Sequence, residues 1–444
     1  MSEFPFLTVL TLIPLAGAIM VSRVEDDQRD TARKLGLTIS LLALLVAGLV
    51  WLKFDAATGM QFVERASWIP SLGVEYHLGV DGLGLTMVVL TALLIPFALM
   101  ASGPVEKQSR TYIALMLLLE AGLFGTFTAL NFFHWFIFWE LSLIPAFFLV
   151  KIWGGPQRTA AAIQFFVYTL VGSVAMLLAF LAIHAATGTF NFLVLADAAR
   201  TGDLNAALFA RFGGGWFESP QSLAMLVFLG VFLGFAVKAP LMPFHTWLPQ
   251  TYAEAPTGVV MVLTGAMSKM GVYGFLRILL PLFPEQMQQA MTPLLALAAA
   301  TIVLSAFAAL AQRDLKRILA YSSVNHIGYC LLGIIAVAST TTGSGFGLAT
   351  EKAAVLNGVI VQMFNHGITA AALFCFVGWM ERRSGGLRSL DDFGGLRKAA
   401  PVFCGLMGIA LFASLGLPGL SGFVGEFLIF KGVFSLSAWA AMVS

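Results

Sequence analysis

Four charged side chains lie inside long apolar runs of this sequence. The chemistry that such buried charged groups suit best is proton transfer. They are Glu140, Lys238, Lys269 and Glu426. An ionised side chain at the centre of a lipid bilayer costs about 2.5–3.5 kcal/mol on an insertion scale, so four of them together cost roughly 10 kcal/mol. Because folding gains nothing from this cost, we expect the four residues to have a function.

Two histidines extend this set of buried titratable groups. His326 and His366 lie in consecutive apolar runs. Histidine titrates near neutral pH, whereas burial lowers the pKa of a lysine and raises that of a carboxylic acid, and a nearby opposite charge reverses each shift. Such groups, joined by water, would form a proton path with an electrostatic gate. The predicted relay therefore consists of Glu140, Lys238, Lys269, His326, His366 and Glu426.

Each member of the relay also has a structural alternative. Glu140 could pair with a neighbouring helix, and Lys238 could donate to carbonyl groups freed by the prolines beside it. Glu426 could be favoured by the dipole at the start of a half-helix. A lone buried histidine is more often a packed core residue than a proton carrier.

Other polar residues near these runs are interpreted separately. Asp81 is predicted to cap the helix that follows it. His134 and His245 are predicted to be interfacial or structural. The roles of Glu120 and Lys431 stay open at this point.

The composition predicts a helical membrane protein that crosses the bilayer many times. Of 444 residues, 59% are hydrophobic and only 11% are charged, whereas soluble domains carry about 25% charged residues. A spanning helix needs about 20 mostly apolar residues. The first apolar run lacks a basic segment before it and a cleavage site after it, so we expect it to be a retained helix. The twelve predicted spans are 4–22, 35–54, 80–102, 111–130, 132–152, 159–186, 222–251, 256–279, 288–311, 316–337, 353–380 and 401–440.

Two of the predicted spans should be broken. The seventh contains Pro240, Pro243 and Pro249, and proline within a helix removes a hydrogen bond and clashes with the preceding turn. The twelfth contains LGLPGLSG at 415–422. Helices broken at membrane depth are typical of transport paths between inverted repeats. We therefore predict two inverted five-helix repeats, the second incomplete, in an all-α fold divided into residues 1–110, 111–280 and 288–444.

Basic residues are concentrated in the odd-numbered connections, which predicts that these connections are cytoplasmic and that the N-terminus lies on the outer side. The net charge of +2 carries little information, because the positions of the charges matter more than their total. No stretch of the sequence resembles a nucleic-acid-binding patch, so we expect no nucleic acid as a partner. The basic residues of the odd-numbered connections are Arg23, Arg29, Arg33, Lys34, Lys107, Arg110, Lys151, Arg158, Arg313, Lys316, Arg317, Arg382, Arg383, Arg388, Arg397 and Lys398.

The cysteines indicate neither a disulfide framework nor a metal site. Cys330, Cys375 and Cys404 lie in apolar runs without the spacing of metal ligands. The sequence also lacks a dinucleotide-binding fingerprint. We therefore predict no metal and no cofactor in this chain.

Several long motifs resemble the antiporter-like, proton-translocating subunits of respiratory complex I (NADH:quinone oxidoreductase), most closely the M type, called chain 4 in mitochondria. These motifs are FWELSLIPAFFLVKIWGG, VKAPLMPFHTWLPQTYAEAPT, KRILAYSSVNHIGY and GFVGEFLIFKG. The resemblance runs from about residue 75 to the end, and Glu426 matches the M type, whereas the L type has lysine there. It implies functional roles for the same six relay residues.

The resemblance also implies a mechanism and partners. Protons would enter from the cytoplasmic side near Lys238, under the control of Glu140, pass Lys269 and the two histidines, and leave from Glu426. Electron transfer from NADH to quinone would drive this movement, with flavin, iron–sulfur clusters and quinone held by partner subunits. The implied partners are other membrane-arm subunits, especially neighbouring antiporter-like ones, in the bacterial inner (cytoplasmic) membrane.

Several alternatives remain open at this level. The D-type component of the multisubunit Mrp-type sodium/proton antiporters shares the pattern. A transporter of a small solute would show a substrate pocket, and a purely structural membrane protein would tolerate neutral replacements. The family has fourteen spans, whereas this sequence ends after the twelfth predicted one, so either the chain is truncated or a partner closes the second repeat.

Overall fold

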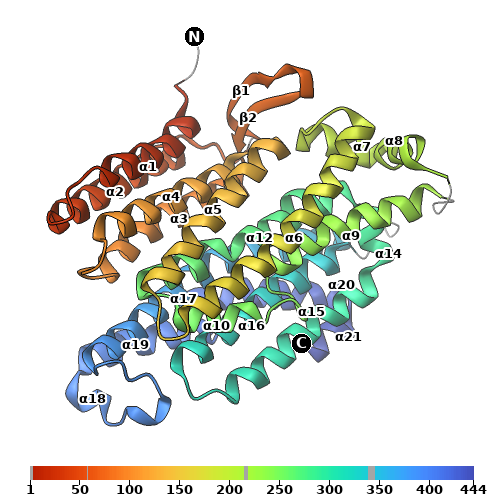
Figure 1. Ribbon diagram of the computed structural model, residues 1–444. Helices are drawn as coiled ribbons and strands as arrows, with labels where there is room; N and C mark the ends of the chain where they lie inside the picture. Colours follow the sequence, from red (N-terminus) through yellow and green to blue (C-terminus); the bar gives the residue numbers. More distant parts are fainter. Residues whose placement is uncertain (1–3, 58, 215–218, 339–345) are drawn as a thin grey trace.

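Long helices make up most of the computed structural model, which describes residues 4–57, 59–214, 219–338 and 346–444. Figure 1 shows these helices running side by side, with a β-hairpin at one end of the bundle and α18 at the other. Ten described helices are long and apolar enough to cross a membrane, and α1 and α19 are shorter apolar helices. The predicted helical membrane fold is therefore confirmed.

The N-terminal region contains a β-hairpin between its second and third long helices, which the sequence analysis missed. The strands are antiparallel and Arg65 lies opposite His77. The backbone N–H of Leu130 donates to the carbonyl of His77 at 2.8 Å, so the hairpin is fastened to the α4–α5 connection. The elements are α1 (Phe6–Ser22), α2 (Arg29–Lys53), β1 (Gln61–Ile69), β2 (Val74–Val80) and α3 (Gly82–Ala101).

The middle of the chain forms helices α4 to α13, and two of them were not predicted. These two, α7 and α8, are short and bury only a few residues such as Leu195, Leu204 and Leu208. The elements are α4 (Ser109–Thr128), α5 (Phe132–Trp153), α6 (Arg158–Thr187), α7 (Phe192–Thr201), α8 (Asp203–Phe212), α9 (Pro220–Lys238), α10 (Trp247–Glu254), α11 (Thr257–Val262), α12 (Lys269–Gly274) and α13 (Leu280–Leu282).

The predicted break in the seventh span is confirmed. Helix α9 ends at Lys238, and the next helix, α10, begins only at Trp247. Pro240 and Pro243 lie in the irregular segment between them. Pro249 lies in the first turn of α10, where a missing N–H breaks no helical hydrogen bond.

The predicted eighth span is one helical segment in which two π-helical turns alternate with α-helix. They are Leu263–Met267 and Phe275–Leu279, and they flank α12 on both sides. Nearly every residue from α11 to α13 is buried, so this segment lies at the centre of the bundle. Single π-helical turns are frequent at functional sites, and Lys269 is the first residue of α12.

The C-terminal part contains the second predicted break, which is also confirmed. Helix α19 ends at Ser414 and α20 begins at Ser421. Gly416 and Gly419 between them have φ angles of 64° and 92°, which side chains other than glycine rarely tolerate. The elements are α14 (Pro284–Gln289), α15 (Met291–Leu310), α16 (Leu315–Val337), α17 (Phe346–Arg383), α18 (Leu396–Ala399), α19 (Pro401–Ser414), α20 (Ser421–Leu436) and α21 (Ala438–Val443).

Candidate functional site

Lys269 and His366 are in direct contact at the centre of the bundle. The Nζ atom of Lys269 lies 2.6 Å from Nδ1 of His366 and donates to the carbonyl of Thr264 at 2.5 Å. The lysine has no exposed surface, and the histidine is 5% exposed. The buried amine of Lys269 on α12 therefore lies close enough to the imidazole of His366 on α17 for a proton to pass between them.

The second histidine continues this row. The ring centroids of His366 and His326 are 5.1 Å apart, with the ring planes at 41°. The Nε2 atom of His366 is buried and has no hydrogen-bond partner in the described part of the chain. One imidazole nitrogen is thus engaged with Lys269 while the other is left without a protein partner.

Glu426 forms the next member of the row. Its Oε1 atom lies 3.1 Å from Nδ1 of His326 and accepts a hydrogen bond from Nε2 of Gln362 at 3.0 Å. On the opposite side of the imidazole, Oγ of Ser414 lies 3.2 Å from Nε2 of His326. Lys269, His366, His326 and Glu426 therefore follow one another through direct neighbours.

The second helix break provides room for the Glu426 carboxylate. A Cβ atom on Gly416 would lie 2.5 Å from Oε2 of Glu426, closer than such contacts allow. The positive φ angle of Gly416 also disfavours a side chain at this position. At the break, the backbone of Gly416 therefore packs directly against Oε2 of Glu426.

Glu140 and Lys238 form a separate part of the predicted relay. The Nζ atom of Lys238, which is 2% exposed, lies 5.1 Å from the ring centroid of Trp139, in a cation–π contact. Oε1 of Glu140 is buried and has no hydrogen-bond partner among the described residues. The expected control of Lys238 by Glu140 is therefore not a direct ion pair, and Trp139 occupies the position beside the lysine.

A small cavity beside Lys238 reaches Ser268, the residue before Lys269. It is lined by Lys238, Tyr252, Met267 and Ser268, among others, and is too narrow to hold a water molecule. Oγ of Ser268 lies 3.5 Å from Nζ of Lys269. In this conformation the six predicted residues therefore form a group of two and a row of four.

Gln362 is a site residue that the sequence analysis missed. It lies four residues before His366 on α17, so both side chains share one helix face. Its Nε2 atom donates to Glu426 and lies 3.4 Å from Nδ1 of His326. The four-residue spacing was the signal that could have identified it. Thr264, Ser414 and Trp139 carried no comparable signal, because their roles depend on tertiary contacts.

The remaining titratable residues have varied environments. Asp81 caps α3 by accepting from the N–H of Gly84 at 3.0 Å, as predicted. Glu120 is fully buried, and neither carboxylate oxygen has a partner among the described residues. His134 packs against aromatic rings including Tyr76. Lys431 pairs with Glu351 at 3.1 Å.

A network of ion pairs around Arg388 was not predicted. The Nε atom of Arg388 lies 2.7 Å from Oδ2 of Asp314, Nη2 lies 3.4 Å from Oε1 of Glu254, and Nη1 lies 3.7 Å from Glu381. Glu381 also pairs with Lys316 at 2.6 Å. Since Glu254 ends α10 and Asp314 precedes α16, this network joins the end of the first broken helix to the C-terminal part of the bundle.

The described residues contain no group of three or more histidine, cysteine, aspartate or glutamate side chains arranged to hold a metal ion. Cys330, Cys375 and Cys404 are free thiols.

Comparisons with known proteins give consistent matches. Residues 129–444 match the family described as NADH:quinone oxidoreductase/Mrp antiporter, TM. NADH-quinone oxidoreductase subunit M of Rhodobacter capsulatus is 38% identical over 441 residues, which cover 98% of this chain and 82% of that protein. The subunit M of Rickettsia typhi is 33% identical, with coverage of 100% and 85%.

Solved structures show the same similarity. A chain of respiratory complex I from Thermus thermophilus with bound NADH superposes with a TM-score of 0.81 at 30% identity, covering 98% of this chain and 84% of the other. A chain of the Mrp complex from Dietzia sp. DQ12-45-1b gives a TM-score of 0.82 at 24% identity, with coverage of 100% and 77%. At that identity the second match shows the fold alone.

Proposed function

Because this chain belongs to the NADH:quinone oxidoreductase/Mrp antiporter transmembrane family, we propose that its buried titratable side chains carry protons across the membrane. In this proposal the chain is the M-type membrane-arm subunit of an NADH:quinone oxidoreductase, and quinone reduction elsewhere in the enzyme drives proton movement. The observation that carries the proposal is the 2.6 Å contact between Lys269 and His366, which places two proton-exchanging nitrogens in one buried row.

In this proposal the order of the side chains gives the path. A proton held at Lys238 moves to Lys269 when the narrow cavity at Ser268 opens and admits water. It then passes through His366 and His326 to Glu426. Glu140 acts on the first step through its charge, since Trp139 lies beside the lysine. Helix breaks at both ends of the relay supply backbone groups that water can solvate.

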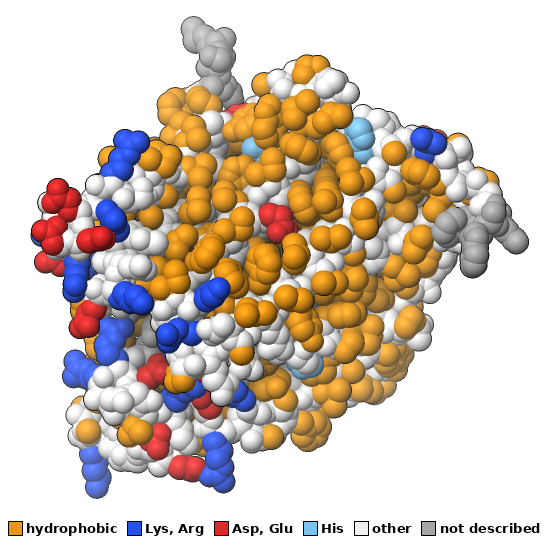
Figure 2. All heavy atoms as spheres, in the orientation of Figure 1, with side chains coloured by type: hydrophobic (Ala, Val, Ile, Leu, Met, Phe, Trp, Pro, Cys, Tyr) orange, Lys and Arg blue, Asp and Glu red, His pale blue; other side chains and the backbone are white. Residues whose placement is uncertain are grey.

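The rest of the assembly follows from the same proposal. Residues 111–280 and 288–444 act as two inverted repeats, each with one broken helix, after the N-terminal segment 1–110. The chain lies in the bacterial inner membrane with its N-terminus outside, beside other antiporter-like subunits. Figure 2 supports a membrane position, because apolar side chains cover the middle of the visible face and charged ones gather at the end that carries α18. Flavin, iron–sulfur clusters and quinone belong to partner subunits.

The test replaces Lys238 by Ala and Glu140 by Gln in the native membrane. Quinone reduction and proton pumping are measured together in sealed vesicles. We expect each substitution to lower proton pumping at least tenfold, the scale typical of a lost proton-transfer group. Lys34→Ala, on the exposed surface of α2, is the control and should pump normally. Wild-type pumping by both relay variants would refute the proposal.

The alternative is a component of a multisubunit sodium/proton antiporter, which the shared fold favours. Two relatives that are more than 30% identical over at least 98% of the chain are instead named NADH-quinone oxidoreductase subunit M. The two functions differ in their driving force. NADH-driven pumping that is independent of sodium supports the main proposal, and proton movement that requires a sodium gradient supports the alternative.

A further inference from the structure

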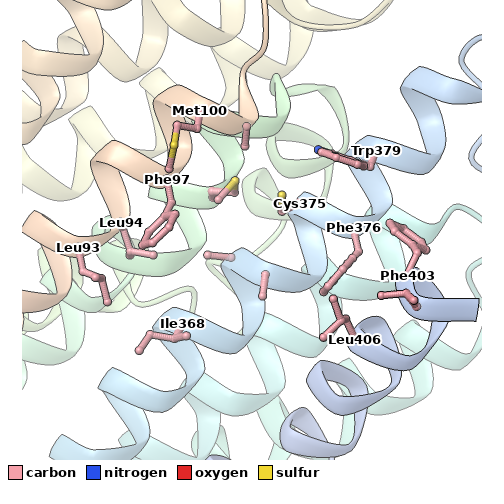
Figure 3. A pocket seen from close by; sticks show the side chains of 15 residues that line it. Leu93, Leu94, Phe97, Met100, Ile368, Cys375, Phe376, Trp379, Phe403 and Leu406 are labelled. Carbon is pink, nitrogen blue, oxygen red and sulfur yellow. The ribbon is translucent and has the colours of Figure 1, made fainter. Parts of the chain in front are cut away.

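An apolar groove lies between α3, α17 and α19, outside the proposed proton path. Its volume is about 620 Å³, within the range of roughly 300–1,000 Å³ that is usual for ligand sites. Figure 3 shows Phe97 of α3, Trp379 and Phe376 of α17 and Phe403 of α19 lining it. All of its lining residues are of apolar types. Such a groove suits hydrocarbon chains.

The groove continues into a second cavity where polar groups begin. This adjoining cavity, of about 360 Å³, shares Trp379 and Phe403 with the groove and is also lined by Arg383 and Ser384. The guanidinium of Arg383 lies 5.7 Å from the ring centroid of Trp379. The apolar groove therefore ends at a cation on the end of the bundle that carries α18.

Three cations lie at this end of the bundle: Arg383 lines the adjoining cavity, and Arg397 and Lys398 follow Leu396, which lines it as well. Arg383, Arg397 and Lys398 are exposed, and no carboxylate of the described residues forms an ion pair with any of them. The acidic side chains nearby have other partners, because Asp391 pairs with Arg313, Glu381 pairs with Lys316, and Asp392 accepts from the N–H of Ser389. The site thus combines an apolar groove with exposed cations at one end that have no ion-pair partner among the described residues.

We propose that this groove binds an anionic phospholipid, with its acyl chains between α3, α17 and α19 and its phosphate at Arg383, Arg397 and Lys398. The charge arrangement favours this occupant over a zwitterionic lipid, whose headgroup carries its own cation. It also favours lipid over an apolar helix of another protein, which would leave the three cations without a counterion. This binding goes beyond the proposed proton transfer and does not depend on it.

The groove also reaches the helix that carries the proton row. Ile368, which lines the groove, lies two residues from His366 on α17, and α19, which also lines it, carries Ser414. A bound lipid would therefore pack between two helices that position the relay. Its removal should loosen α17 against α19 before it affects α12.

Photo-crosslinking of the whole complex in vesicles tests the proposal. Phosphatidylcholine vesicles receive a trace of either photoactivatable phosphatidylglycerol or photoactivatable phosphatidylcholine, each with the reactive group on an acyl chain. Cross-linked peptides are then mapped by mass spectrometry. We expect phosphatidylglycerol to label the α17 and α19 peptides strongly and phosphatidylcholine to label them weakly.

Charge-removing variants identify the headgroup site. Each exposed cation near a membrane surface changes the affinity for anionic lipid roughly fivefold, so replacing Arg383, Arg397 and Lys398 by Gln together should reduce phosphatidylglycerol labelling to the phosphatidylcholine level. The matched control replaces three exposed cations near the α1–α2 turn and should leave the labelling unchanged. These control residues are Arg23, Arg29 and Lys34.

Two further measurements test lipid binding without the triple variant, in case that variant assembles poorly. Ala372→Trp fills the groove without touching a cation and should abolish labelling of the same peptides. A photo-crosslinker on Cys375, which lines the groove, reports its occupant once Cys330 and Cys404 are replaced by Ala. Equal labelling by the two lipids, labelling that survives the triple substitution, or capture of a neighbouring subunit by Cys375 would each overturn the proposal.

Discussion

The amine of Lys269 and the imidazole of His366 lie within hydrogen-bonding distance of each other, with Nζ 2.6 Å from Nδ1. A protonated lysine can donate to a neutral imidazole nitrogen, and a neutral amine can accept from a protonated imidazole, so either group can hold a proton placed between the two nitrogens. The carbonyl of Thr264 holds the amine in place at the same time. The contact therefore fixes the positions of both groups and leaves the proton free to move between them.

Lys269→Arg should block proton transfer although it keeps the positive charge. A guanidinium does not lose its proton in proteins, so Arg at this position could form hydrogen bonds but could not pass a proton to His366. We expect proton pumping in vesicles to fall at least tenfold. If the lysine served only as a structural cation, the arginine variant would pump better than Lys269→Ala, and that result would contradict the relay.

Gln362→Leu should weaken the outer part of the row. The amide donates to Glu426 at 3.0 Å, and a hydrogen bond to a charged group contributes about 1.5–3 kcal/mol. Because this energy helps to hold the carboxylate beside His326, we expect proton pumping to fall about tenfold. Thr369→Ala is the control on the same helix, since its hydroxyl bonds only to carbonyls of α17. Equal pumping by the two variants would rule out a role for the amide.

Arg388→Gln should destabilise the protein more than it affects any single transfer step. The arginine bridges Asp314, Glu254 and Glu381, and because only Glu254 of these residues is fully buried, we expect its loss to cost about 1–3 kcal/mol, between the values for exposed and buried pairs. We expect the midpoint of thermal inactivation of the complex to fall by several degrees. Arg313→Gln removes an exposed pair with Asp391, which is worth less than about 1 kcal/mol. A similar midpoint for both variants would show that the network contributes little.

The β-hairpin should lose stability below neutral pH because of His77. Burial, followed by the nearby Arg65, lowers the pKa of His77, while Glu75 opposes the shift. The Oδ1 atom of Asn191 caps α7, so its Nδ2 atom faces Nδ1 of His77 at 3.0 Å as a donor. The imidazole must then be neutral in the folded hairpin, since a protonated Nδ1 would oppose another donor.

The sign of this pH effect follows from the lowered pKa. The stabilisation is complete above the unfolded pKa of about 6.5 and is lost as the pH falls through it toward the folded value. Hydrogen exchange of residues 61–80, corrected for its intrinsic pH dependence, should become faster between about pH 7 and pH 5. His77→Asn keeps an acceptor but cannot titrate, so its protection should not change with pH. Protection of the wild type that is constant over this range would contradict the prediction.

The features that could be predicted from the sequence are those that depend on residues close together in the chain. Pro240 and Pro243, close together, and the glycines near Pro418 favour a helix break locally, and both breaks were found at the expected positions. Buried charges can also be predicted from a sequence, because a charged residue such as Lys269 in the middle of a long apolar run must lie inside the membrane-spanning region. The direct neighbours of these residues were not predictable, because they come from helices far apart in the chain.

Arg388 and Lys316 illustrate the same limit. Their positions between predicted spans indicated only a cytoplasmic connection, whereas the structure places Lys316 at 3% exposure in an ion-pair network. The pairing partners lie in three separate segments, and no local pattern links them. The β-hairpin was missed for a related reason, since β1 is largely exposed and lacks a regular alternation of apolar and polar residues.

The two π-helical turns around α12 allow this short helix to act as a swivel. Each residue of an α-helix turns the chain by about 100°, and a π turn holds one residue more than an α turn. Moving that extra residue past α12 would rotate Lys269 by about 100° while the ends of the segment stay in place. The rotation would carry the amine away from His366 and separate Lys269 from the rest of the row in a single step.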